Sequence, residues 1–192
     1  NIFKSIKKND HENVNKVVKI YMFLTLCLTI TFSIWCKEIL HLLIRNNSLL
    51  VYYAWSVVIV MSYNYRPYYV LLNQYLSYNE NVKYLPYFTF VPGIINLGLN
   101  FILMPFFGIK VAVYTTFGCY ILMGFAAFLF KKMRDSFVTN YTPILILTFI
   151  IVSTFFCYFI VDSNFFVKGI SNLIILIIAF AILNDFRKKN PN

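Results

Sequence analysis

Six apolar runs, each close to the length needed to cross a lipid bilayer, constrain this chain more than any other feature. A transmembrane helix needs about 20 apolar residues. The runs are Val17–Cys36, Leu49–Leu76, Tyr84–Phe107, Ile109–Phe130, Pro143–Val161 and Phe165–Leu183. Only 12% of the residues are charged and 60% are hydrophobic, whereas about 25% of the residues in a soluble domain are charged. We therefore predict an all-α integral membrane protein with about six transmembrane helices.

Prolines and glycines predict where these helices bend or end. The second run is too long for one straight crossing, and Pro67 within it predicts a kink or a break. The third and fourth runs are separated only by Gly108, just after Pro105, which predicts a tight helical hairpin. The candidate hinge residues are Pro67, Pro92, Gly93, Pro105 and Gly108. The connections are short, so no separate soluble domain is expected.

The distribution of basic residues predicts how the chain is oriented. The chain has 17 Lys and Arg against 7 Asp and Glu. Eleven of the 17 precede the first run, follow the last, or lie in the second-to-third and fourth-to-fifth connections, and Lys19, at the very start of the first run, makes twelve on that side; only four fall on the other side. Because cytoplasmic segments are enriched in Lys and Arg, we expect both ends of the chain in the cytoplasm. No basic patch stands clear of the membrane, so we expect no nucleic-acid partner.

A polar stripe runs along one face of the third apolar run. Pro92, Asn96 and Asn100 are spaced four residues apart, and Thr89 lies just before them on nearly the same stripe. Pro92 and the adjacent Gly93 allow the helix to bend. Buried amides are costly in hydrocarbon unless they are paired. The stripe therefore predicts either a helix that lines a hydrophilic cavity or amides that join neighbouring helices, and one helix can do both.

Arg66 is the only Lys or Arg placed well within an apolar run. A cation inside a membrane predicts a functional role, here the attraction of a phosphate or carboxylate group. The alternative is structural: Arg66 lies about 26 Å along a straight helix from Leu49, which would place it near the inner interface, where its side chain can reach the lipid headgroups.

Nothing in the sequence predicts an enzyme active site. None of the seven acids lies at the centre of a run, and both histidines lie at or outside the interface. No nucleophile–base pair is visible, and the four cysteines have no metal-binding spacing. We therefore expect no catalytic residues, no metal site and no cofactor.

One stretch resembles a family of transporters. The run Pro92-Gly-Ile-Ile-Asn-Leu-Gly-Leu-Asn-Phe-Ile-Leu-Met-Pro-Phe-Phe-Gly-Ile109 is similar to the Asn-x-x-Leu-Asn-x-x-Leu-x-Pro-x-x-Gly-Ile pattern of bacterial polysaccharide (O-antigen type) flippases. These belong to the multidrug/oligosaccharidyl-lipid/polysaccharide exporter superfamily. The pattern usually continues Gly-Ala-Ala-x-Ala-Thr, where this chain has Val111-Ala-Val-Tyr-Thr-Thr116. Lys37-Glu-Ile-Leu40 and Tyr52-Tyr-Ala54 also resemble the family.

The resemblance implies a fold of two six-helix bundles that face a central cavity. Residues 1–130 would then form four helices of the second, C-terminal bundle, and residues 131–192 a terminal helix pair with a basic cytoplasmic tail. The implied function is to move undecaprenyl-pyrophosphate-linked oligosaccharides across the bacterial inner membrane by alternating access. The implied partners are the lipid-linked oligosaccharide, membrane lipids and the missing N-terminal half of the transporter. The chain begins at Asn1 without a signal peptide, so we expect it to be a fragment.

Other functions remain open from the sequence. A drug or small-molecule exporter of the same superfamily would usually carry a carboxylate in a span, and none is visible. A membrane-embedded polysaccharide polymerase or acyltransferase would need polar catalytic groups, often on a long external loop, and the loops here are short. A purely structural membrane subunit would have little use for the polar stripe. The substrate-cavity candidates are Arg66, Asn96, Asn100 and Thr89.

Overall fold

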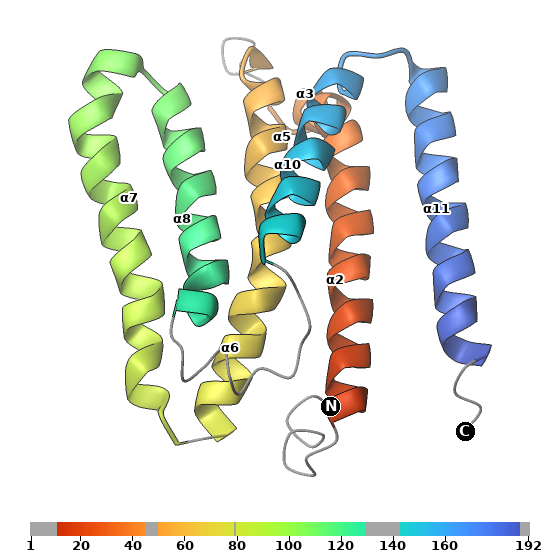
Figure 1. Cartoon of the computed structure of the whole chain (residues 1–192). Coiled ribbons are helices and arrows are strands. Elements are labelled where there is room, and N and C mark those ends of the chain that lie inside the picture. The colour runs from red at the N-terminus through yellow and green to blue at the C-terminus, as the bar shows by residue number, and fades with distance from the viewer. Residues whose placement is uncertain (1–10, 45–49, 79, 130–142, 189–192) are drawn as a thin grey trace.

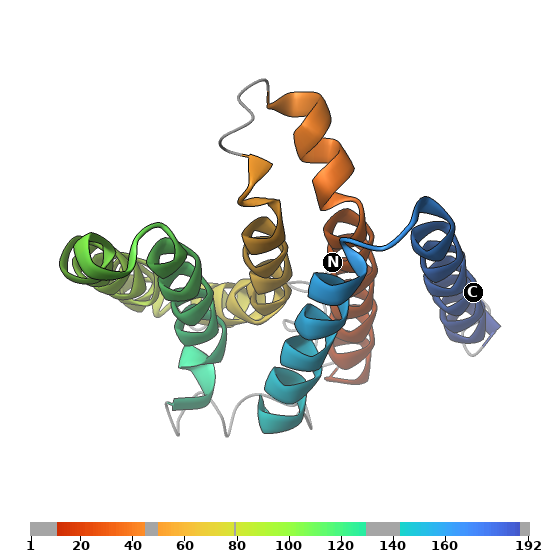
Figure 2. The same ribbon diagram turned by 90° about the horizontal axis from the view of Figure 1, so that it is seen from above.

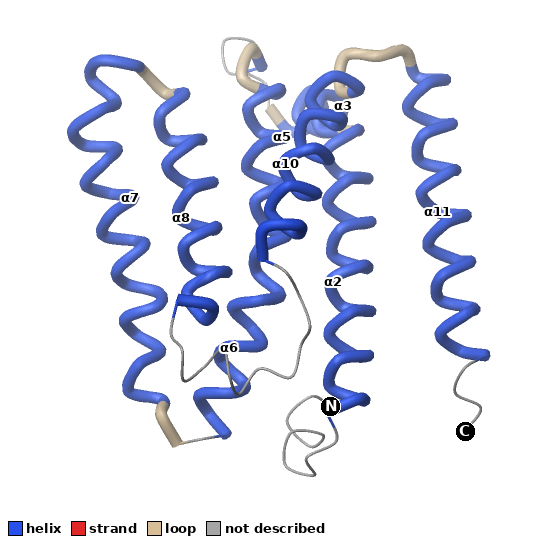
Figure 3. Tube along the Cα trace, in the orientation of Figure 1, coloured by secondary structure: helices blue, strands red, loops and turns tan. Residues whose placement is uncertain are grey.

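The computed structural model describes residues 11–44, 50–78, 80–129 and 143–188, in which helices are joined by short turns and no strand is found (Figures 1 and 3). The longer helices are α2 (His11–Ile34), α5 (Tyr53–Ser62), α6 (Arg66–Tyr78), α7 (Leu85–Phe107), α8 (Lys110–Leu129), α10 (Pro143–Ile160) and α11 (Phe165–Lys188). The shorter elements are α3 (Cys36–Leu43) and the 3-10 turns η1 (Tyr63–Tyr65) and η2 (Val82–Tyr84). The predicted all-α fold is confirmed for these residues.

Three segments of the described chain are long and apolar enough to cross a membrane: Lys16–Ile34, Val82–Phe107 and Phe165–Ile182. Their outward side chains are largely uncovered, as in Phe101, which is 85% exposed, and Ile170, which is 61% exposed. Water-soluble proteins rarely leave so much contiguous apolar surface uncovered. The chain is therefore a membrane protein, as the sequence predicts.

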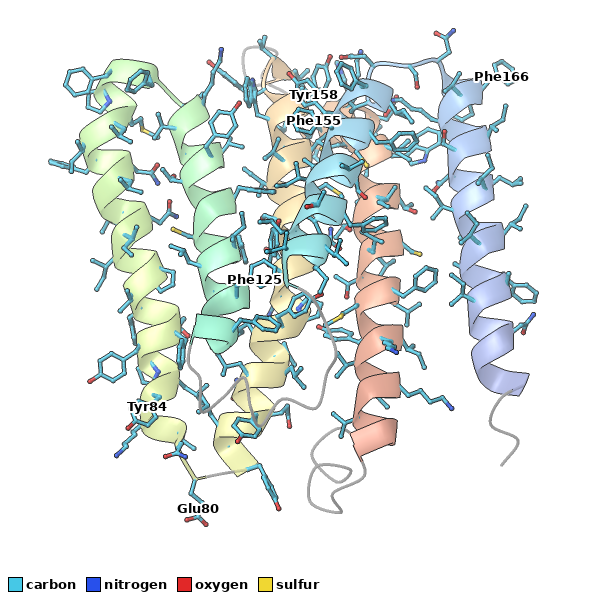
Figure 4. All side chains as sticks on the ribbon, viewed as in Figure 1. Glu80, Tyr84, Phe125, Phe155, Tyr158 and Phe166 are labelled. Atoms are coloured by element: carbon cyan, nitrogen blue, oxygen red, sulfur yellow. The ribbon has the colours of Figure 1, made fainter. Side chains whose placement is uncertain are left out.

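Successive long segments run in alternating directions (Figure 1). α2, α7 and α10 run from the lower to the upper end in this view, whereas α5–α6, α8 and α11 run back. The start of α2 and the end of α11 consequently lie at the same, lower end. Figure 4 shows Glu80 and Tyr84 at this lower end and Tyr158 and Phe166 at the upper end.

The buried apolar residues are divided between two main clusters. One joins α3, α5 and α10 near the upper end through Cys36, Val57, Met61, Cys157 and Val161. The other joins α6, α7 and α8 nearer the lower end through Leu72, Leu76, Phe88 and Ala126. The two clusters hold α5–α6 between the α7–α8 pair and α2, while α7 and α11 lie at opposite edges (Figure 2).

The second apolar run breaks where a proline predicts, but just before it. α5 ends at Ser62, η1 covers Tyr63–Tyr65, and Pro67 lies in the first turn of α6. A proline is tolerated there because backbone N–H groups of a first turn have no partner within the helix. Inside the break, the buried Asn64 side chain donates to the Met61 carbonyl (2.9 Å) and to Thr29 Oγ1 (2.9 Å). The Asn64 side chain thus links the break to α2.

The hairpin predicted at Gly108 is confirmed. α7 ends at Phe107 and α8 begins at Lys110. Gly108 has a φ of 72° and a ψ of −164°, a region that is essentially restricted to glycine. Pro105 lies within the last turn of α7 rather than at its end; it removes one hydrogen bond from the helical ladder, and the helix ends two residues later at Phe107.

Candidate functional site

Arg66 lies about midway along the α5–α6 segment. Tyr53, at the start of this segment, is about 20 Å away along the helix axis, and Tyr78, at its end, is about 18 Å away. This is closer to the middle than the sequence predicts, since regular helix begins only at Tyr53 and continues past Leu76. The Arg66 side chain is exposed. No ion pair to it is found among the residues that the structure describes.

Two tyrosines accompany Arg66. Its guanidinium carbon lies 6.0 Å from the centre of the Tyr63 ring, a cation–π distance. The Tyr63 ring in turn lies 5.3 Å from the ring of Tyr120, a residue about halfway along α8. We call Arg66, Tyr63 and Tyr120 the Arg66 patch. It combines one exposed cation with two aromatic rings, about midway along the α5–α6 segment and α8. Such a patch can bind an anionic group and stack a ring-shaped one.

The predicted polar stripe on α7 meets a matching set of hydroxyls on α8. Thr115 Oγ1 donates to Asn100 Oδ1 (2.8 Å), and the Asn100 amide donates to Asn96 Oδ1 (3.1 Å). The Asn96 amide reaches Thr116 Oγ1 at 3.5 Å. Both asparagines are half-buried. The structure therefore brings Asn96 and Asn100 together as a polar contact between two helices, the second of the two roles that the sequence leaves open.

The other predicted residues of α7 lie on either side of this contact. Thr89 is exposed and shares a hydrogen bond of 2.8 Å with the hydroxyl of Tyr69 on α6. Pro92 is buried, and its carbonyl accepts the Cys119 thiol at 3.1 Å. Gly93 is exposed, and a Cβ added to it would meet no neighbouring helix within 4 Å. Thr89 and Arg66 are thus on neighbouring helices, whereas Asn96 and Asn100 face α8.

Sequence reasoning does not identify a buried ion pair at the upper end. The Lys168 ammonium lies 2.6 Å from Glu38 Oε1, and the Lys168 side chain is 1% exposed, against 40% for Glu38. The Lys168 ammonium also lies 6.0 Å from the centre of the Trp35 ring. Glu38 is on α3 and Lys168 on α11, so the pair ties these two helices together. The predicted orientation makes this pair possible, because it places both Glu38 and Lys168 on the side of the membrane away from the cytoplasm.

A second, exposed cluster lies beside this pair. Lys37 Nζ lies 3.0 Å from Asp162 Oδ1, and the Tyr53 hydroxyl donates to the same oxygen. These hydrogen bonds from Tyr53 and Lys37 lower the pKa of the Asp162 carboxyl. The hydrogen bond to Asp162 raises the pKa of the Lys37 ammonium. The cluster links α3, the start of α5 and the turn between α10 and α11.

This cluster predicts a loss of stability in acid. A lowered carboxyl pKa contributes stability above the unfolded pKa of about 3.9, and this is lost as the pH falls through the folded pKa. We expect the thermal midpoint in detergent to fall below about pH 4, and Asp162→Asn to reduce that fall. The effect should be below about 1 kcal/mol because both partners are substantially exposed. An identical acid response of wild type and Asp162→Asn would contradict the assignment.

Comparisons with protein-family models, with curated proteins and with solved structures found no match to this chain, so they assign it to no family.

Proposed function

We propose that this chain is part of a bacterial inner-membrane flippase that moves undecaprenyl-pyrophosphate-linked oligosaccharide units by alternating access, for surface polysaccharide synthesis. The headgroup of such a lipid carries sugars and phosphates, and it cannot cross about 30 Å of hydrocarbon unaided. A protein that moves it must offer a polar, cationic surface at mid-depth. The resemblance of residues 92–109 to this family supports the proposal.

The direction of the helices supports six crossings. α2, α5–α6, α7, α8, α10 and α11 alternate in direction. α8 has 20 residues and α10 has 18, lengths near the lower part of the range for a transmembrane helix. The lower end in Figure 1 then corresponds to the cytoplasm, because the lysine- and arginine-rich connections belong to that side. We assign the helices within residues 1–130 to the second of two facing bundles and α10 and α11 to a terminal pair, with the first bundle as their partner.

The observation that carries the proposal is the Arg66 patch. An exposed guanidinium halfway along a membrane helix is costly in contact with lipid, so such residues face a cavity or the interior of a bundle. Guanidinium binds two phosphate oxygens at once. The rings of Tyr63 and Tyr120 provide apolar faces next to it. A pyrophosphate bound at Arg66 would thus place the adjoining sugar against tyrosine rings.

Complementation tests the proposal. A strain that lacks its own oligosaccharide flippase receives the full-length gene that contains this chain, as wild type, Arg66→Ala, Arg66→Lys or Lys83→Ala. Wild type should restore long-chain surface polysaccharide on a gel. Arg66→Ala should lower it about tenfold or more, since a hydrogen bond to a charged group contributes about 1.5–3 kcal/mol and 1.4 kcal/mol is a factor of ten. Arg66→Lys should fall between the two.

Lys83→Ala is the matched control, because it removes the same charge from an exposed residue at the end of the helices. It should complement as well as wild type, at equal protein levels. Complementation by Arg66→Ala at the wild-type level would remove Arg66 from the substrate path. Failure of wild type in several hosts with different sugars would overturn the flippase proposal itself.

A further inference from the structure

An open apolar pocket lies against the bend between α2 and α3. α2 ends at Ile34, Trp35 occupies the bend, and α3 begins at Cys36. A cavity of about 410 Å³ lies against this bend, within the volume range of small-molecule sites. We call it the elbow pocket, and it is lined by Thr31, Phe32, Trp35, Glu38, Ile39 and Leu42. These positions form a single helical stripe that continues from α2 into α3.

The position of the pocket along the helices is fixed by α11. Three contacts join α11 to the bend between α2 and α3. Thr31 Oγ1 donates to Asn172 Oδ1 (2.9 Å). The Trp35 and Phe165 rings lie 4.9 Å apart, and Lys168 pairs with Glu38. One membrane-crossing segment ends at Ile34 and another begins at Phe165. The elbow pocket therefore lies where the hydrocarbon of the bilayer meets the headgroups. Figure 1 places α3 at the upper end, and Figure 2 shows it projecting outward from the other helices.

The lipid-facing surface of α2 leads directly into the pocket. Leu24, Leu28 and Phe32 are spaced four residues apart and are 39%, 59% and 56% exposed. At the other end of the stripe, Leu42 is 88% exposed. A hydrocarbon chain lying along this stripe would pass from the middle of the bilayer to the membrane-facing side of α3. Its path is mainly apolar, since the Thr31 hydroxyl is paired with Asn172, and Glu38 would lie at the level of the lipid headgroup.

We propose that the elbow pocket binds one acyl chain of a bilayer phospholipid. Lipid tails are as apolar as the side chains that line the pocket, so packing contacts, rather than transfer out of water, would hold the chain there. The inference is independent of the proposed transport function. It assigns α3, which the sequence does not predict, the role of covering a lipid chain at the membrane boundary.

Tryptophan fluorescence tests this proposal, because the chain has only two tryptophans. Trp55→Phe leaves Trp35, in the pocket, as the only tryptophan, and excitation at a wavelength that tyrosine does not absorb isolates its emission. Trp35→Phe leaves Trp55, which packs against the Tyr114 and Tyr158 rings. Both proteins are reconstituted into phosphatidylcholine bilayers with acyl chains that are either plain or brominated near the headgroup. Brominated chains should quench Trp35 at least about twofold more than Trp55, because bromine quenches only at contact distance, Trp35 lines the pocket, and the Trp55 ring packs against two tyrosine rings.

Leu42→Asp and Leu43→Asp, each made in the Trp55→Phe background, form a matched pair. Both residues are exposed near the end of α3, at 88% and 73%, but only Leu42 lines the pocket. Leu42→Asp should reduce the quenching of Trp35 about twofold, since a carboxylate disfavours hydrocarbon, whereas Leu43→Asp should leave it unchanged. An equal loss of Trp35 quenching in both variants would overturn the proposal, because it would show that Trp35 meets lipid by general contact at the interface and not in the pocket. If Trp35 is quenched no more than Trp55, no acyl chain occupies the pocket, and a protein segment becomes the occupant to test. If added polyprenyl phosphate abolishes the quenching of Trp35, the occupant is a carrier lipid and not a phospholipid.

Discussion

Replacing Glu38 with glutamine is expected to lower the free energy of unfolding by about 3 kcal/mol. The Lys168 side chain is 1% exposed, and its ammonium pairs with Glu38 at 2.6 Å. Removing one partner of a buried ion pair leaves an uncompensated buried charge, which costs about 3–5 kcal/mol. We place the effect at the lower limit because the Glu38 side is 40% exposed. Unfolding of the purified protein in mixed micelles with increasing dodecyl sulfate, followed by circular dichroism, measures the change.

Replacing the partner, Lys168, should have a smaller effect. Lys168→Met removes the fully buried charge and leaves Glu38, whose side chain is 40% exposed although its Oε2 is buried, so we expect a smaller loss of about 1–2 kcal/mol. The double variant Glu38→Gln/Lys168→Met should be more stable than Glu38→Gln alone, which is a coupling between the two sites. Lys37→Met, at the exposed pair with Asp162, is the control and should cost less than about 1 kcal/mol. Equal losses for Glu38→Gln and Lys168→Met would contradict the burial of Lys168.

Replacing Gly124 with alanine should destabilise the protein by about 2 kcal/mol. A Cβ at Gly124 would lie 2.7 Å from the carbonyl oxygen of Tyr65 and 2.9 Å from its Cβ. Both atoms belong to or adjoin the backbone of η1, so α8 must move away from the α5–α6 break. Overpacking costs about 1–3 kcal/mol, and this outweighs the gain of up to about 1 kcal/mol from replacing glycine by alanine in a helix. The same micelle unfolding assay measures the difference.

Gly118→Ala is the control in the same helix. No atom of a neighbouring helix lies within 4 Å of a Cβ at Gly118, so the substitution should be neutral or raise the stability by up to about 1 kcal/mol. A Gly124→Ala variant as stable as Gly118→Ala would show that α8 does not pack against Tyr65 as described. Because Tyr65 precedes Arg66, Gly124→Ala is also expected to shift the Arg66 patch.

Much of the local structure could be predicted because it depends on neighbouring residues. Gly108 predicts the α7–α8 hairpin, and the structure has it, since the turn needs a backbone conformation that other residues avoid. Pro67 predicts a break in the second run, which lies at η1. α3 is missed, because eight residues of mixed polarity after an apolar run have no distinctive length or period.

The candidate site could be predicted only in part. The sequence identifies Arg66 as an unusual cation, but its depth depends on where α5 and α6 begin and end. It identifies Asn96 and Asn100 as one stripe, but it leaves their partner open; the structure supplies Thr115 and Thr116. Tyr120 as a neighbour of Tyr63 is not predicted at all, because the two residues lie on different helices.

The sequence by itself determined that the chain is helical, that it belongs in a membrane, and where its helices turn, because hydrophobicity, proline and glycine act on adjacent residues. Only the tertiary structure decided which polar groups meet: Glu38 with Lys168, Asn100 with Thr115, and Arg66 with the tyrosines. The physical reason is that burial and pairing depend on how helices are rotated and shifted against one another. That arrangement is set by side-chain packing across the whole bundle, at contacts such as Gly124 with Tyr65.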